Sequence, residues 1–177
     1  RAEHLEALPA QTGSVPGQFP FVRGAGEPWR FAQNWVPPAE AIRADLWHEA
    51  GATAAQELGY AIAAGVDRLA AGGEANHFVF AIGSNYFLEI AKLRAARLLW
   101  AQATAAFGTP QLMTIHARTS RLNKSLLDPN TNLLRVTTEA MAAVLGGCQS
   151  LTVEAFGFDE HLAVNVQRIL KEEARLD

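Results

Sequence analysis

Three polar residues, His116, Arg118 and Ser120, alternate at the end of a short apolar segment, residues 112–116, that we predict to be a buried strand. Side chains at the carboxyl ends of parallel strands form the binding sites of barrel folds. An imidazole there can hydrogen-bond a carbonyl oxygen, and a guanidinium can bind a carboxylate or a phosphate through two hydrogen bonds. The same side chains could instead hydrogen-bond the backbone of the polar loop at residues 117–130. We interpret them as ligand contacts and not as catalytic groups.

An imidazole and a carboxylate also stand side by side at His48 and Glu49, as in an acid/base pair. Adjacent helical residues point about 100° apart, so these side chains do not face each other, which favours a helix-capping role for residues 45–48. The histidines show no metal-ligand spacing with one another or with the single cysteine: His4, His48, His77, His116, His161 and Cys148. No serine lies in a G-x-S-x-G motif. We therefore expect no metal site and no hydrolase chemistry, and we assign no catalytic residue.

The composition excludes several classes of protein. The chain has 177 residues, of which 49% are hydrophobic and 19% charged, with a formal net charge of −3. This length suits one domain, and without a basic stripe we expect no nucleic-acid partner. No apolar run approaches the ~20 residues of a membrane span, so we expect no membrane association. The lone Cys148 fits a reducing compartment, which predicts a cytoplasmic protein and a thiol packed as a small apolar side chain.

The elements that position these residues alternate between helix and strand. Apolar periodicity predicts helices at residues 49–71, 84–107, 131–145 and 159–175, and strands at residues 77–82, 112–116 and 151–154. Ser84 or Asn85 caps the second helix, and Asp128 with Pro129 marks the start of the third. The strands begin about 35–40 residues apart, the interval of strand–helix units with right-handed crossovers and a parallel sheet.

Parallel strand–helix units form either a (β/α)8 barrel or an open doubly wound sheet. No glycine-rich nucleotide fingerprint follows any strand, which favours the barrel. Because a complete barrel takes ~250 residues, we predict an α/β fold with a partial or shortened (β/α)8 TIM-type barrel of parallel strands. Residues 39–177 hold its βα repeats. The proline-rich residues 1–38 form an extended N-terminal arm plus the first strand, at residues 29–35.

Two long segments carry a family resemblance. Residues 82–100 begin Ile82-Gly-Ser-Asn-Tyr-Phe-Leu-Glu, and residues 128–151 begin Asp128-Pro-Asn-Thr-Asn-Leu-Leu-Arg. Both closely resemble the methylmalonyl-CoA mutase family, and shorter matches at residues 16–24 and 49–58 follow the family's order. The resemblance implies a (β/α)8 substrate barrel preceded by an extended arm that wraps a partner subunit. Active members of the family rearrange the carbon skeleton of an acyl-CoA thioester with adenosylcobalamin.

The resemblance also implies where the cofactor binds. The family holds cobalamin largely in a separate C-terminal domain with a D-x-H-x-x-G motif, and this sequence has no such motif. We therefore expect a partner subunit, and not this chain, to bind adenosylcobalamin. Between residues 36 and 42 about three βα units of the family pattern are missing, which leaves two sheet edges that the arm or a partner must cover.

Two departures from the family pattern bear on activity. Where active members have W-T-I-R-Q-Y, this chain has Trp29-Arg-Phe-Ala-Gln-Asn, so Ala32 and Asn34 replace the arginine and the catalytic tyrosine. Where they have Y-H-M-Q, it has Asp45-Leu-Trp-His, so the Tyr-His pair is lost and His48 falls on the glutamine position. These losses resemble the non-catalytic small subunit of heterodimeric mutases.

The resemblance marks further residues as facing substrate or cofactor. Asn85 and Glu89 match positions near the adenosyl group, although Asn85 could simply cap its helix and Glu89 could belong to a charged helix face with Lys92 and Arg94. The full set of candidates is Gln33, His48, Asn85, Glu89, His116, Arg118 and Ser120.

Three functions remain open at this point. The chain is a non-catalytic barrel that supports a catalytic partner in an adenosylcobalamin-dependent acyl-CoA mutase, or a homodimeric half-barrel that binds acyl-CoA, or a non-functional truncated remnant. The expected partner is accordingly a large cobalamin-binding mutase subunit or a second copy of the chain.

Overall fold

The computed structural model describes residues 28–108 and 110–176, and residues 1–27 of the predicted arm lie outside the described residues. Five strands form one sheet in the order β1-β5-β4-β3-β2, and every neighbouring pair is parallel. The strands are β1 (Arg30–Phe31), β2 (Ile42–Arg43), β3 (His77–Ile82), β4 (Thr114–Thr119) and β5 (Ser150–Thr152). The prediction of an α/β fold with parallel strands is confirmed.

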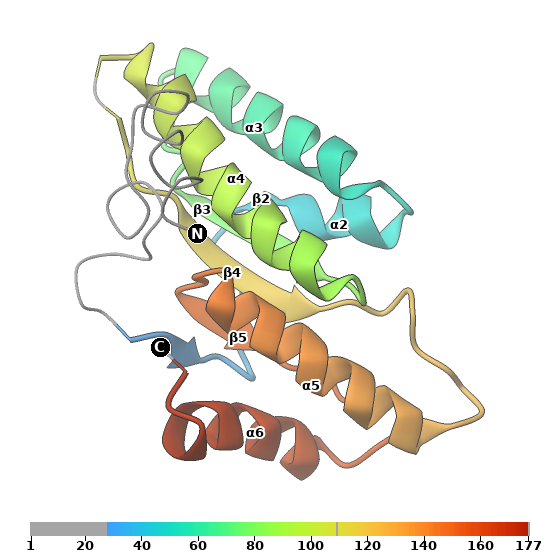
Figure 1. Ribbon diagram of the computed structural model, residues 1–177. Coiled ribbons are helices and arrows are strands. Elements are labelled where there is room, and N and C mark those ends of the chain that lie inside the picture. Colours follow the sequence, from blue (N-terminus) through green and yellow to red (C-terminus); the bar gives the residue numbers. More distant parts are fainter. Residues whose placement is uncertain (1–27, 109, 177) are drawn as a thin grey trace, which may run out of the picture.

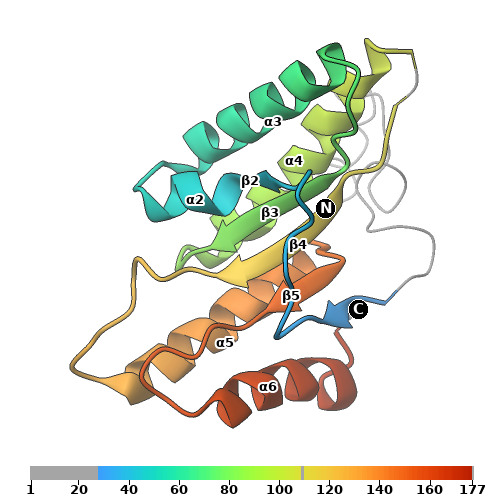
Figure 2. The ribbon, with the colours of Figure 1, turned by 180° about the vertical axis from the view of Figure 1, so that it is seen from behind.

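The helices of the described chain are α2 (Ala44–Glu49), α3 (Ala54–Ala70), α4 (Tyr86–Ala105), α5 (Pro129–Leu145) and α6 (Glu160–Arg168), followed by the π-helical turn η1 (Ile169–Glu173). The long helices α3 to α6 cover one face of the sheet (Figure 1). On the opposite face, the connection between β1 and β2, residues 32–41, crosses from one sheet edge to the other (Figure 2). Because β1 pairs with the last strand, as first and last strands do in a closed barrel, the arrangement is consistent with part of a barrel.

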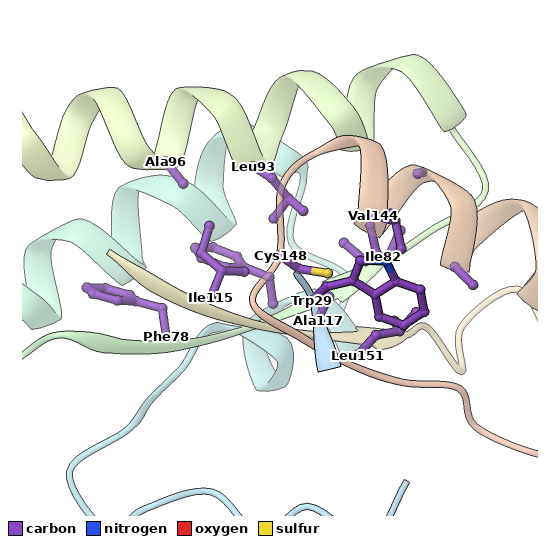
Figure 3. Packing of buried hydrophobic residues seen from close by; sticks show 14 of the residues in the cluster. Trp29, Phe78, Ile82, Leu93, Ala96, Ile115, Ala117, Val144, Cys148 and Leu151 are labelled. Atoms are coloured by element: carbon purple, nitrogen blue, oxygen red, sulfur yellow. The ribbon is translucent and has the colours of Figure 1, made fainter. Parts of the chain in front are cut away.

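The hydrophobic core lies between the sheet and its helices. Phe78 of β3, Leu93 of α4 and Cys148 point into it (Figure 3), which agrees with the predicted packing of the thiol. Trp100 packs edge-on against Phe78 with ring centroids 4.9 Å apart. Gly65 lets α3 approach this pair, because a Cβ there would lie 2.6 Å from Cζ3 of Trp100. Within residues 28–108 and 110–176, no helix combines the length and apolarity needed to cross a membrane.

Several predicted boundaries are wrong. The single helix predicted at residues 49–71 is two helices, α2 and α3, because Gly51 between them adopts φ 93° and Thr53 begins α3 with a capping box. Strand β2 was not predicted, since two residues show no periodicity. The strand predicted at residues 112–116 lies at Thr114–Thr119, and the strand predicted at residues 29–35 shrinks to β1. The last predicted helix changes into a π-helical turn after Arg168.

Candidate functional site

Most of the candidate site residues lie near the carboxyl ends of the strands. Arg118 is the penultimate residue of β4, and Ser120 follows the strand, with its backbone N–H donating to the carbonyl of Ile82 at 2.9 Å. His116 lies in the middle of β4, so the prediction that it ends the strand is wrong. The strand continues to Thr119, and His116 and Arg118 therefore share the sheet face that the helices leave open.

Arg43, Asp45, Arg118, Arg121 and Glu154 form a network that we call the arginine cluster. Asp45 accepts hydrogen bonds from Nε and Nη2 of Arg43 at 2.8 and 2.7 Å, and its Oδ2 lies 3.2 Å from Nη1 of Arg118. Arg118 donates from Nε and Nη2 to Oε1 of Glu154, the first at 3.1 Å. Nη2 of Arg121 donates to the other oxygen of Glu154 at 2.8 Å. Three guanidinium groups thus alternate with two carboxylates.

The strand register brings this cluster together. Arg118 of β4 pairs with Ala81 of β3 in the sheet, and the small methyl group of Ala81 leaves room for the guanidinium to reach Asp45 on α2. A cavity of about 270 Å³ opens beside it, lined by Ala81 and by residues of the cluster. Most of the side chains that line the cavity are therefore charged, and they are joined to one another by hydrogen bonds.

The electrostatics of the cluster follow from these hydrogen bonds. The bond to Asp45 raises the pKa of Arg43 above its ordinary value. Partial burial by itself would raise the pKa of Glu154, but the hydrogen bonds from Arg121 and Arg118 outweigh it and lower that pKa. The bond to Glu154 likewise raises the pKa of Arg121. Arg43, Arg121 and Glu154 are therefore charged at neutral pH.

A second network, the lysine cluster, consists of His48, Glu57, Glu89, Lys92 and Ser120. Nζ of Lys92 lies 2.7 Å from Glu57, 2.6 Å from Glu89 and 2.6 Å from the carbonyl of Ala81. His48 lies 3.4 Å from Glu57 through Nδ1 and 3.0 Å from the hydroxyl of Ser120 through Nε2. Both the lysine and Glu57 side chains have no exposed surface. Both ring nitrogens of His48 therefore have partners, which fix the orientation of its ring near the carboxyl ends of β3 and β4.

The alternative interpretation of Glu89, as part of a charged helix face with Lys92 and Arg94, does not hold for two of the three residues. Glu89 and Lys92 are buried, and only Arg94 faces solvent. Gly83, just after β3, makes room for the buried groups, since a Cβ there would lie 3.3 Å from His48 and 3.4 Å from Glu89. The i,i+3 spacing of Glu89 and Lys92 suits the ion pair that they form, but spacing alone does not show whether the pair is buried or exposed.

The other candidates have local roles. Asn85 is exposed at the start of α4 and is its N-cap residue, but its side chain makes no capping hydrogen bond. Gln33 donates from Nε2 to the carbonyl of Val153 at 2.8 Å and accepts from Gln167 at 2.8 Å, which joins the end of β1 to β5 and α6. The predicted capping role for residues 45–48 is wrong, because Asp45 binds arginines and makes no cap bond in α2.

His116 is covered by the connection between β1 and β2. The indole of Trp35 stacks on its ring with centroids 3.7 Å apart and an interplanar angle of 17°. Nδ1 lies 2.7 Å from the hydroxyl of Ser150, and Nε2 lies 3.1 Å from that of Thr152. Burial, with a contribution from the nearby Arg118, lowers the pKa of His116 to about 3, so the imidazole is neutral at physiological pH.

Sequence reasoning missed six members of the two clusters: Arg43, Asp45, Glu57, Lys92, Arg121 and Glu154. Glu154 carried a usable signal, because it follows β5 as Ser120 follows β4, and parallel strands end at the same edge. Glu57 lies far along the chain from Lys92, and only the packing of α3 on α4 joins them.

The imidazoles of His48 and His116 do not fit a cobalt ligand, because each uses both ring nitrogens within the chain. Among the described residues, no group of three histidine, cysteine, aspartate or glutamate side chains is placed to hold a metal ion. The chemistry available here is the binding and orientation of charged groups by arginine, lysine and carboxylate side chains.

The chain is similar to known proteins over most of its length. Residues 27–176 match the family model described as methylmalonyl-CoA mutase. The small subunit of methylmalonyl-CoA mutase from Porphyromonas gingivalis is 42% identical over 153 residues, which cover 73% of this chain and 25% of the relative. The small subunit from Streptomyces virginiae is 36% identical over 189 residues, which cover 94% of this chain and 30% of the relative. The mutase of Rhizobium meliloti is 35% identical over 178 residues, which cover 87% of this chain and 25% of the relative.

The parallel sheet with helices on one face and a charged carboxyl end defines an α/β protein built from βα units. The chain belongs to the methylmalonyl-CoA mutase family, as its resemblance predicted. It spans about a quarter to a third of the length of the relatives it matches.

Proposed function

We propose that the chain is a non-catalytic, small-subunit-like component of an adenosylcobalamin-dependent acyl-CoA mutase. In this proposal it is a cytoplasmic, shortened (β/α)8 barrel with an N-terminal arm, and it supports a catalytic partner that interconverts methylmalonyl-CoA and succinyl-CoA. Family membership and the similarity to two small subunits support this role.

The single observation that carries the proposal is that residues 32–41 cross the open face of the sheet and cover its middle. Barrel enzymes bind their substrates among side chains at the carboxyl ends and mouth of the barrel. Here residues 32–41 cross that face, and Trp35 lies on His116 at stacking distance. The losses at Ala32 and Asn34 fall in or beside the same connection. A chain that covers its own interior is suited to a structural role.

The cofactor belongs to the partner in this proposal. When bound, adenosylcobalamin supplies the radical chemistry of the mutase reaction. His48 and His116 are each engaged at both ring nitrogens within the chain, so neither of these two is placed to serve as a cobalt ligand. Asn85, exposed at the start of α4, remains the residue of this chain that we expect to face the partner's adenosyl group, whereas Glu89 is buried in the lysine cluster.

Light scattering coupled to size-exclusion chromatography tests the proposal. The natural probe is the large subunit of methylmalonyl-CoA mutase from Porphyromonas gingivalis, because the small subunit of that organism is similar to this chain. We expect a 1:1 complex that is heavier than the large subunit by 19.1 kDa, and no mutase turnover by the chain alone. The absence of a complex at micromolar concentrations, with both proteins folded, contradicts the proposal. An unrelated α/β protein of similar mass serves as the control for non-specific association.

The other two functions make different predictions. A homodimeric half-barrel that binds acyl-CoA needs an open inner face, and Trp35 covers His116 in the middle of that face. A non-functional remnant does not require a cooperative fold, whereas the buried clusters and the continuous core of this chain predict a single unfolding transition. Calorimetric titration with acyl-CoA and a urea unfolding curve separate these alternatives.

A further inference from the structure

The carboxylate of Asp45 is held by two arginines in the way that proteins hold a carboxylate ligand. Its two oxygens receive Nε and Nη2 of Arg43 in a bidentate arrangement at 2.8 and 2.7 Å, and Nη1 of Arg118 adds a third contact at 3.2 Å. The Asp45 side chain is only 4% exposed. Paired parallel hydrogen bonds from a guanidinium are the geometry by which proteins recognise free carboxylates.

The surroundings of Asp45 have the character of a ligand site. The carboxylate lies in the wall of the cavity of about 270 Å³, whose lining is Arg43, Asp45, Leu46, Glu49, Ala81, Arg118, Thr119 and Arg121. The two arginines come from β2 and β4, on either side of β3, where Arg43 pairs with Val79 and Arg118 pairs with the small Ala81. Removal of the Asp45 carboxylate would therefore join its space to the cavity and leave Arg43 without its anionic partner.

We propose that Arg43 and Arg118 form a binding site for a small carboxylate and that Asp45 fills this site from within the chain. In the unaltered protein the site is closed to carboxylates from solution. The inference does not depend on the proposed mutase role, because it concerns the isolated chain. A failure to bind the large subunit leaves it standing.

The test is rescue of Asp45→Ala by acetate, which supplies the lost carboxylate. Melting temperatures are measured in sodium acetate and in sodium chloride of equal ionic strength. We expect the unaltered chain to melt at the same temperature in both salts. We expect Asp45→Ala to melt lower in chloride and to recover saturably in acetate, by about 3–6 °C at ten times the dissociation constant. Acetamide, which has the same shape without the charge, should give no recovery.

Two control variants make the result specific. Asp67→Ala removes an exposed aspartate from α3 and should melt alike in both salts. Asp45→Ala combined with Arg43→Met, which removes the bidentate guanidinium, should lose the acetate response. The proposal is overturned if folded Asp45→Ala shows no saturable response to acetate, or if Asp67→Ala or the double variant responds equally. If Asp45→Ala is unfolded in chloride, recovery of the native circular dichroism spectrum in acetate supports the proposal, and an unfolded chain in both salts overturns it.

Discussion

Replacing Lys92 with methionine tests the reasoning about the lysine cluster. Lys92 lies within 2.7 Å of Glu57, Glu89 and the carbonyl of Ala81, and its side chain has no exposed surface. Methionine keeps most of the volume but leaves two carboxylates in the interior without their ammonium partner. Removing one partner of a buried ion pair costs about 3–5 kcal/mol of the free energy of unfolding. We expect Lys92→Met to lose about that much.

The assay is urea unfolding followed by circular dichroism and tryptophan fluorescence. With an m-value of roughly 2 kcal/mol/M, the midpoint of Lys92→Met should fall by about 1.5–2.5 M. Arg94→Met is the matched control, because Arg94 lies two residues further along α4 and is exposed, and its midpoint should change by less than about 0.3 M. Adding Glu57→Gln and Glu89→Gln to Lys92→Met should restore most of the loss, since the neutral side chains need no counter-charge. If Lys92→Met unfolds at the same urea concentration as Arg94→Met, the reasoning about this cluster is refuted.

Three further predictions follow from the core and the inner face. Gly65→Ala should destabilise the fold by about 1–3 kcal/mol in the same urea assay, because its new methyl group would press against Trp100, whereas Gly59→Ala on the open side of α3 should not. The pKa of His116 is lowered to about 3 in the folded state, so between pH 3 and pH 6.5 the unfolded chain binds a proton that the folded chain does not. The free energy of unfolding should therefore fall from pH 6.5 towards pH 4. His116→Gln should make the urea midpoint less dependent on pH over this range. Trp35→Ala should lower the free energy of unfolding by about 1–2 kcal/mol, because the stack on His116 is lost. Because Trp35 covers His116, calorimetric titration of the unaltered chain should show no acyl-CoA binding at high micromolar ligand. Binding at low micromolar ligand would contradict the covered inner face.

The sequence predicted the long elements and missed the short ones. Helices α4 and α5 and strand β3 have enough residues for an apolar pattern and clear end signals, such as Asp128, which accepts hydrogen bonds from the first-turn N–H groups of α5. Strand β2 has two residues and exists only because it pairs with β3, so no local signal marks it. The break between α2 and α3 was not predicted, because the apolar pattern on both sides of Gly51 is helical and the sequence does not show its positive φ.

The candidate site was predicted in part for a similar reason. Arg118, Ser120, His48 and Glu89 were selected, and the structure places all four near the carboxyl ends of the strands. Their partners could not be predicted, because Lys92 and Glu57 are separated by 35 residues and Arg118 and Glu154 by 36. Burial of charge depends on which helix packs over it, and a single sequence does not specify this.

The pairing of the first strand with the last has a consequence for synthesis of the chain. Gln33 bonds to Val153 across 120 residues, and the indole of Trp29 donates to the carbonyl of Leu176 across 147. At 5–20 residues per second, a ribosome takes roughly 6–24 s to add 120 residues. During that time β1 has no strand to pair with, while β2, β3 and their helices can already dock on one another. Strand β1 is therefore fixed only after β5 and the residues up to Leu176 have been made.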